Sequence, residues 1–292
     1  MQAVLNLAIP GITFLILLAV GLDLTPADFA RVRHQPGIVT AGLVGPLLLL
    51  PPLALLLIFA FSPTADLRAG LLLVVACPIG GISNMYSYLA GASTALSVTL
   101  TAFSSVLAVL TIPLLDTVFG AVSGRRMGLT APLPLIVGQL LLMLALPVAL
   151  GMWARFSQPV LAGRSQRYLR AVGFGGIVAL IVLIVASDPV GFVNGLAGTV
   201  PLAATFVATS FVAGWFVGGL TGASRSDRFT LATEFATRNV AVAAAIAVTL
   251  AGRVEFALFA TTYFLTEAPL MLAAIIMFRR VSAPAASDMT LV

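Results

Sequence analysis

The chain has 292 residues, of which 60% are hydrophobic and only 9% are charged. A soluble domain carries roughly a quarter charged residues, because its surface must be covered with polar groups. The composition therefore excludes an ordinary soluble domain, and it equally excludes a disordered or disulfide-rich chain. The formal net charge is +5, and its basic part consists of arginines that lie mostly at segment ends. Arginines in such places set membrane topology, so we expect no nucleic-acid partner.

Long apolar runs follow one another along the whole sequence. A membrane-spanning helix needs about 20 mostly apolar residues, and these runs are too long and too uniform for barrel strands. We therefore expect an all-α polytopic membrane protein, embedded in the lipid bilayer, with nine transmembrane helices. The predicted helices cover residues 3–22, 38–61, 67–89, 94–119, 131–153, 168–187, 196–221, 227–250 and 255–279.

The arginines also favour one orientation. With the N-terminus outside, ten arginines fall on the cytoplasmic side and four on the other, while Arg238 lies inside a predicted helix. Positive residues collect on the cytoplasmic side of membrane proteins. We expect a protein of a bacterial inner (plasma) membrane with its N-terminus outside and its C-terminus in the cytoplasm.

Two of the predicted helices are interrupted. The sequence CPIGGISN (77–84) places a proline and two glycines inside one apolar run, and both residue types weaken a helix. The sequence EFATRN (234–239) places charged and polar side chains inside another. An offset of about 160 residues maps the first interrupted helix and its neighbours onto the second interrupted helix and its neighbours. This predicts an inverted-topology repeat of four and five helices, whose discontinuous helices indicate a binding site near the membrane midplane.

Several oxygen-bearing side chains accompany these interruptions. Glu234 is a carboxylate in the middle of a predicted helix. Placing a charge there costs free energy, so such a residue is functional by default. Ser83 and Asn84 follow the first break, while Ser97 and Thr101 share one face of the next helix. Oxygen ligands around a carboxylate suit a hard cation such as Na⁺. The alternative is that the hydroxyls bond back to their own helices and the asparagine joins two helices.

Three stretches closely resemble a known family. They are CPIGGISNMYSYLAGASTALSVTLT (77–101), EFATRNVAVAAAIAV (234–248) and VGLDLTPADFARVRHQP (20–36), and they resemble the two broken-helix regions and the first cytoplasmic loop of the bile acid:sodium symporter family. The resemblance covers most of the chain and implies that family's nine-helix form, in which two discontinuous helices cross. It also implies a core domain and a panel domain that move against each other. The core helices lie within residues 38–119 and 196–279, and the panel helices are 3–22, 131–153 and 168–187.

The resemblance further implies a transporter rather than an enzyme. The expected activity is sodium-coupled symport of an organic anion, bile-acid-like or a small carboxylate, by alternating access, with no cofactor beyond the coupling ion. The family's first sodium site falls on residues that all match in type, namely Ser83, Asn84, Ser97, Thr101 and Glu234.

The family's second sodium site does not match. A glutamine expected four residues after the glutamate is Arg238 here, and another falls near Pro46. A guanidinium stays charged and repels Na⁺, so we interpret Arg238 as a fixed charge in place of the second sodium. Glu234 and Glu267 are its expected counter-charges, and coupling to one cation follows. The alternative is that Arg238 reaches an interface or forms a structural pair.

The interruptions also offer places for an anionic substrate. Backbone donors near Gly80 and Gly81, the start of the helix after Asn239, and Arg238 itself suit a carboxylate. The glycines alternatively serve only to let the two broken helices cross.

Three other functions stay open from the sequence. A proton-coupled transporter would use Glu234 or Glu267 as the titrating group. An arsenite-exporter-like efflux protein would use Cys77, which precedes the first break. A non-transporting receptor or scaffold is the third, although such a protein has no reason to bear two polar interruptions.

Overall fold

The computed structural model describes residues 2–25, 30, 33–123, 129 and 132–282 of the chain. Within this part every regular element is helical, and two extended residues form a bridge. The helices are α1 (Gln2–Asp23), α3 (Pro36–Phe61), α4 (Ala65–Ala76), α5 (Ile82–Ala90), α6 (Thr94–Ser123), α7 (Leu133–Leu140), η1 (Leu141–Ala145), α8 (Leu146–Ser157), α9 (Pro159–Ser187), α10 (Pro189–Leu220), α11 (Arg225–Ala236), α12 (Val240–Thr249) and α13 (Val254–Ser282).

Five stretches of helix in the described part are long and apolar enough to cross a membrane. They are Pro36–Phe61, Thr94–Ala121, Leu133–Ser157, Pro189–Leu220 and Glu255–Val281. The protein is therefore an integral membrane protein, as its composition predicts. Both interrupted segments break where the sequence indicates, since α4 ends at Ala76 and α11 ends at Ala236.

Local chemistry explains where several helices begin. Thr64 and Ser224 cap α4 and α11, because their side-chain oxygens accept from the backbone N–H groups of Leu67 and Asp227. Pro159 and Pro189 open α9 and α10, seven to nine residues before the apolar runs predicted there. Proline fits the first turn of a helix, where its missing donor costs nothing. Both helices therefore extend beyond their apolar runs.

The predicted helix at 131–153 contains a local irregularity. Its middle turn, Leu141–Ala145, is a π-helix, and Pro147 follows at the start of α8. A proline has no N–H for the helical ladder, and a π-turn is one way in which the neighbouring bonds shift to accommodate it.

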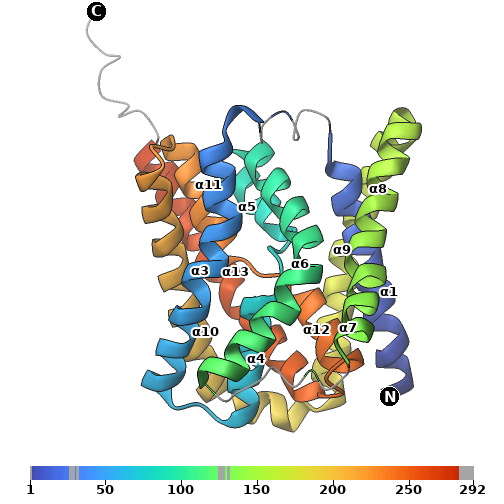
Figure 1. Ribbon diagram of the computed structural model, residues 1–292, viewed down its shortest axis with the longest axis vertical. Helices are drawn as coiled ribbons and strands as arrows, with labels where there is room; N and C mark the ends of the chain where they lie inside the picture. The colour runs from blue at the N-terminus through green and yellow to red at the C-terminus, as the bar shows by residue number, and fades with distance from the viewer. Residues whose placement is uncertain (1, 26–29, 31–32, 124–128, 130–131, 283–292) are drawn as a thin grey trace, which may run out of the picture.

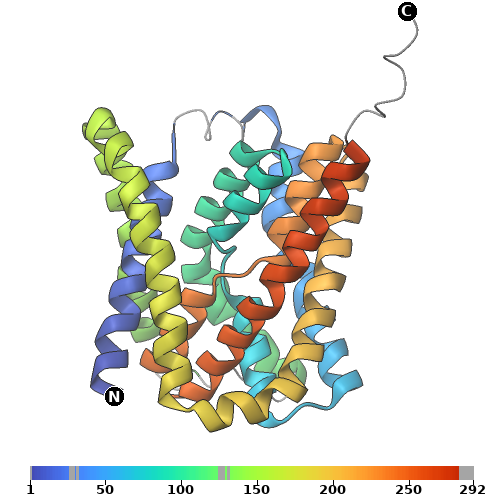
Figure 2. The ribbon, with the colours of Figure 1, turned by 180° about the vertical axis from the view of Figure 1, so that it is seen from behind.

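The two interrupted helix pairs form the centre of the molecule. Every residue from Gly70 to Gly80 and from Phe229 to Val248 is buried. Figures 1 and 2 show α1, α8 and α9 together on one side of this centre, with α3, α10, α11 and α13 on the other. A helix that is apolar on all sides, as α12 is, belongs inside a larger assembly of helices.

Charged residues gather at the two ends of the molecule. The ends of α1, α8 and α13 and the start of α11 lie at one end of the molecule, whereas the N-terminus lies at the opposite end (Figure 1). Arg155, Arg225 and Arg279 belong to those terminal turns. Arg31, Arg125 and Arg126, which entered the orientation count, lie outside the described residues.

An exposed charged cluster joins the residue before α13 to the first turns of α4 and α13. Arg253 contacts Glu255 at 3.2 Å and Asp66 at 2.6 Å, and these two carboxylates raise the pKa of Arg253. Both residues of the Arg253–Asp66 pair are 47% exposed. Exposed pairs of this kind contribute little to stability, because water and salt screen them.

Candidate functional site

The two helix breaks face each other and pair through their backbones. Ile79 and Arg238 form an antiparallel bridge between the link 77–81 and the link 237–239. The N–H of Gly80 donates to the Thr237 carbonyl at 3.2 Å, and the N–H of Asn239 donates to the Pro78 carbonyl at 2.8 Å. A break leaves backbone groups without helical partners, and in a membrane each such group must be satisfied internally. Each broken helix therefore supplies hydrogen-bond partners for backbone groups of the other.

Close approach of the two links requires a glycine at one position. A Cβ atom added to Gly80 would lie 2.8 Å from the carbonyl oxygen of Arg238, closer than real Cβ atoms come. At Gly81 the nearest atom would be the end of the Val20 side chain, at 3.4 Å. Gly80 thus permits the crossing, whereas Gly81 meets no comparable steric limit.

A buried carboxylate lies beside the crossing. Glu234, in the last turn of α11, is 0% exposed. Its Oε2 accepts from the Ser83 hydroxyl at 3.1 Å and the Thr101 hydroxyl at 3.4 Å, and its Oε1 accepts from Ser97. These donors come from α5 and α6, so three helices converge on one carboxylate.

Asn84 completes this group. Its Oδ1 accepts from the Ser97 hydroxyl at 2.8 Å and from the Thr101 hydroxyl at 3.3 Å. All five residues that the sequence predicts for the cation site therefore lie within one hydrogen-bonded cluster. Its ligand atoms would all be oxygens, as hard cations prefer. Among the described residues no three His, Cys, Asp or Glu side chains gather as a metal site.

Arg238 lies at the crossing itself and is 4% exposed. Its Nη2 donates to the carbonyls of Val75, at 3.2 Å, and of Cys77, both freed by the end of α4. Its Nε and Nη1 have no hydrogen-bond partner within the part of the chain that the structure describes. Among the described residues no acidic side chain forms an ion pair with it, but Glu234, one of the two expected counter-charges, lies near enough to attract the guanidinium electrostatically. The direct hydrogen-bond partners of the guanidinium are therefore the freed carbonyls.

Glu267 forms a separate buried contact on α13. It is 0% exposed, its Oε1 accepts from the Thr237 hydroxyl at 3.1 Å, and the Tyr86 side chain lies beside the same carboxyl group. One turn earlier on α13, Tyr263 donates to the Ala236 carbonyl at the end of α11. Sequence reasoning missed Thr237 and Tyr263. The four-residue spacing of Tyr263 and Glu267 is a signal that could have found the tyrosine.

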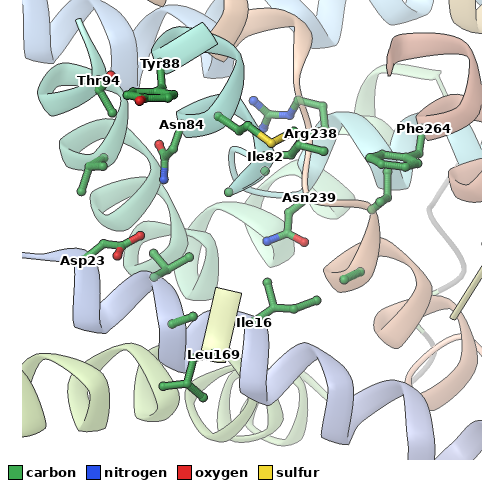
Figure 3. Close-up of a pocket in the computed structure, with 18 residues that line it drawn as sticks. Ile16, Asp23, Ile82, Asn84, Tyr88, Thr94, Leu169, Arg238, Asn239 and Phe264 are labelled. Carbon is green, nitrogen blue, oxygen red and sulfur yellow. The ribbon is translucent and has the colours of Figure 1, made fainter. Parts of the chain in front are cut away.

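A pocket of about 390 Å³ opens beside the crossing, lined by residues of α1, α5, α6, α9, α12 and α13. Gly80, Gly81, Asn84, Arg238 and Asn239 are among its lining residues. Figure 3 shows the side chains of Asn84 and Asn239 directed into it. The Oδ1 of Asn239 accepts from the Val242 N–H at 3.1 Å, which leaves its amide nitrogen for a ligand. Most of the remaining lining is apolar.

Cys77 is not among the residues that line this pocket. Its side chain is 0% exposed and lines a smaller cavity of about 20 Å³, together with Pro46 and Arg238. A thiol in that position has no access to a ligand in the large pocket.

Two interrupted helices that cross around a buried carboxylate define a polytopic membrane protein of the transporter class. A family model described as the sodium bile acid symporter family matches residues 10–189, and the chain belongs to that family. The family and the relatives below are transporters rather than enzymes.

Relatives come from bacteria, plants and mammals. The chain is 29% identical to the uncharacterized sodium-dependent transporter YocS of Bacillus subtilis over 174 residues, which is 60% of this chain and 53% of that protein. It is 28% identical to the probable chloroplastic sodium/metabolite cotransporter BASS2 of Oryza sativa over 231 residues, 77% of this chain and 52% of that protein. It is 36% identical to BASS1 of Arabidopsis thaliana over 110 residues, 38% of this chain and 27% of that protein. The chain thus spans about half the length of the first two.

Proposed function

We propose that the protein is a sodium-coupled symporter of an organic anion, bile-acid-like or a small carboxylate, that works by alternating access. The observation that supports this most is the buried cluster around Glu234, where hydroxyl, amide and carboxylate oxygens meet beside a pocket. The relatives are described as sodium-dependent transporters and sodium/metabolite cotransporters, which agrees with the proposal.

In this proposal Na⁺ binds at Ser83, Asn84, Ser97, Thr101 and Glu234. A carboxylate inside a membrane protein needs a compensating charge, and one monovalent cation supplies it. The three hydroxyls that now donate to Glu234 have lone pairs with which they can turn to a cation instead. Binding of Na⁺ would therefore replace hydrogen bonds without moving the helices far.

Only one sodium ion is proposed for each cycle, with Arg238 and Glu267 in place of the second ion's site. In broken-helix transporters, the carbonyls at an unwound segment are where coupling ions bind. Here the Arg238 guanidinium already donates to two such carbonyls, those of Val75 and Cys77. Two acids, Glu234 and Glu267, against one arginine leave a net charge of −1, which one cation neutralises.

The substrate carboxylate is proposed to bind at Gly80, Gly81 and Asn239, within reach of Arg238. Asn84 supports coupling between the two ligands, because its Oδ1 belongs to the cation cluster while its side chain lines the pocket. Sodium would fix this asparagine and raise the affinity for the anion, and the anion would raise the affinity for sodium by the same factor.

The wider architecture is also part of the proposal. Nine membrane crossings in an inverted repeat fit the element positions, since α11 begins at Arg225, 160 residues after α4 begins at Ala65, and both have 12 residues. We assign α1, α7 with α8, and α9 to the panel domain and the other helices to the core domain. Arginines from several helices lie at the end of the molecule where α1 finishes. They favour a cytoplasmic location for that end, in a bacterial inner membrane with the N-terminus outside.

Thermal unfolding in detergent, measured with Na⁺ and with choline, tests the cation site. Na⁺ should raise the melting temperature of the wild type but not of the Glu234→Gln variant, because a neutral amide supplies no negative charge to balance the bound cation. Glu255→Gln, at an exposed glutamate, is the matched control and should respond like the wild type. Stabilisation that persists in Glu234→Gln would reject the site.

Uptake into proteoliposomes tests the coupling ion and its number. Uptake should depend on Na⁺ at fixed pH with a Hill coefficient near one. A coefficient near two would reject the single-cation proposal. Uptake that follows a pH gradient in choline, without Na⁺, would favour proton coupling instead.

A further inference from the structure

Two arginines in the first turn of α11 extend to neighbouring helices. The start of α11 lies beside the ends of α10 and α13 (Figure 2). The Arg225 guanidinium lies 5.3 Å from the ring centroid of Phe278, and its Nη1 donates to the Val281 carbonyl at 3.2 Å. The Arg228 guanidinium lies 4.7 Å from the ring centroid of Trp215, and its Nε donates to the carbonyl of the same residue at 3.4 Å. Aromatic and backbone contacts thus hold both guanidinium groups in place.

These contacts leave the two positive charges without a carboxylate partner in the described part of the chain. Asp227 lies between the two arginines in sequence, but its carboxylate accepts from the Ser224 hydroxyl at 2.7 Å. By contrast, Arg253, before the start of α13, contacts two carboxylates. A guanidinium has five N–H donors, and each of the two arginines uses one of them in the bonds described above. Most of their donors therefore stay available to an anion from outside the protein.

The surroundings of the two arginines are those of a membrane interface. Phe216 and Leu220, one turn apart at the end of α10, are 65% and 88% exposed. Apolar side chains exposed on a membrane-spanning helix face lipid chains, and tryptophan residues such as Trp215 are enriched where those chains meet the headgroups. Arg279 and Arg280, exposed in the last turn of α13, add positive charge at the same end. An occupant with an anionic head and apolar chains fits both parts of this surface.

We propose that an anionic phospholipid binds at the adjoining ends of α10, α11 and α13. Its phosphate group lies at Arg225 and Arg228, and an acyl chain lies along Phe216 and Leu220. The planar donors of a guanidinium match the oxygens of a phosphate group, and the cytoplasmic leaflet supplies anionic lipids. Because α11 also carries Glu234, the bound lipid stabilises the helix that provides the carboxylate of the cation cluster.

Thermal unfolding of the full chain in detergent tests the proposal with three probes: phosphatidylglycerol, phosphatidylcholine with the same acyl chains, and inorganic phosphate. An arginine near a membrane surface favours an anionic lipid by about fivefold, so two arginines predict about thirtyfold tighter binding of phosphatidylglycerol than of phosphatidylcholine. Inorganic phosphate should give no shift at millimolar concentration, because it lacks the chains. Equal binding of the two lipids overturns the proposal, and so does a phosphate shift as large as that of phosphatidylglycerol.

A pair of variants with equal charge locates the site. The double variant Arg225→Gln, Arg228→Gln should lose the thirtyfold preference, and its melting temperature in phosphatidylcholine shows whether it is folded. The control is Arg155→Gln, Arg164→Gln, which removes the same charge from α8 and α9. The control should bind phosphatidylglycerol within about twofold of the wild type. Equal losses in the two double variants would show that only general surface charge acts, and would overturn the proposal.

Tryptophan fluorescence gives a second test that leaves both arginines in place. The chain has two tryptophans, so Trp153→Phe makes Trp215 the sole emitter. Phosphatidylglycerol with brominated acyl chains should quench this emission at a lower mole fraction than brominated phosphatidylcholine, because the bound chain lies next to Trp215. Quenching at the same mole fraction by both lipids contradicts a specific lipid site at this place.

Discussion

Ile79 and Arg238 face each other as an antiparallel bridge, although they lie on different broken helices. The arginine that we propose stands in place of a second sodium ion is thus also the centre of the backbone bridge, whose hydrogen bonds are made by its neighbours Thr237 and Asn239. Its side chain then donates to carbonyls at the end of α4. Charge, backbone pairing and helix termination therefore meet at one residue, and substitutions around it separate these roles.

Replacing Gly80 by alanine should destabilise the crossing. Its Cβ atom would lie 2.8 Å from the Arg238 carbonyl oxygen, and backbone atoms cannot move aside as a flexible side chain can. We expect a loss of about 1–3 kcal/mol, the usual range for overpacking, measured as the change in unfolding free energy in detergent.

The matched control is Gly81→Ala, at the next residue in the same link. There the added Cβ atom meets only the end of the Val20 side chain at 3.4 Å, so stability should stay close to that of the wild type. Equal losses in the two variants would mean that the link tolerates no substitution at all, and would contradict a specific steric limit at Gly80.

Removing the Ser97 hydroxyl should weaken sodium binding. The Ser97 hydroxyl lies within hydrogen-bonding distance of both Glu234 and Asn84, so it supplies one oxygen and also helps to position two others. We expect the sodium concentration for half-maximal stabilisation to rise about tenfold in Ser97→Ala, the effect of losing one charge-assisted contact.

Ser105→Ala is the comparison variant on the same helix. The Ser105 hydroxyl is buried and donates to the Thr101 carbonyl at 2.8 Å, which lies outside the proposed ligand set. Its sodium response should match that of the wild type. A similar rise in both variants would indicate a general effect on α6 rather than loss of a ligand.

Replacing Arg238 by methionine should lower stability by about 2 kcal/mol, because the carbonyls of Val75 and Cys77 would lose their donor in a buried place. Lysine keeps the charge but not the planar set of donors, so Arg238→Lys should fall between methionine and the wild type. The measurement is chemical unfolding in detergent without substrate.

Arg164, exposed in α9, offers the control for this series. Arg164→Met should leave the unfolding free energy unchanged, as surface substitutions usually do. Unchanged stability in Arg238→Met would instead support the alternative in which this side chain merely reaches toward an interface.

Much of the fold follows from local sequence features. Pro78, Gly80 and Gly81 interrupt α4 and α5 because proline lacks a donor and glycine favours no helix, and neither effect needs a distant partner. The five predicted cation residues could be grouped because their motifs resemble those of a known family. Helix boundaries were less accessible, since α9 and α10 begin at prolines outside the apolar runs.

The partners of the buried charges could not be predicted in the same way. Glu234 and Glu267 are expected as counter-charges of Arg238 from opposite charge alone. In the structure the guanidinium meets carbonyls of α4, and Glu267 meets the Thr237 hydroxyl. Such contacts depend on which groups from several helices come within about 3 Å of one another. The separation of two residues along the chain does not predict that distance.

Composition and local sequence were enough to predict that the protein lies in lipid, where two of its helices break, and that Glu234 is a buried carboxylate. Composition and backbone propensity act residue by residue, so they can be read without a fold. The folded arrangement was needed to show that Gly80 must lack a side chain, that Asn84 belongs to the cation cluster and also lines the pocket, and that Asp23 lines that pocket. Each of these depends on groups from distant segments meeting in space.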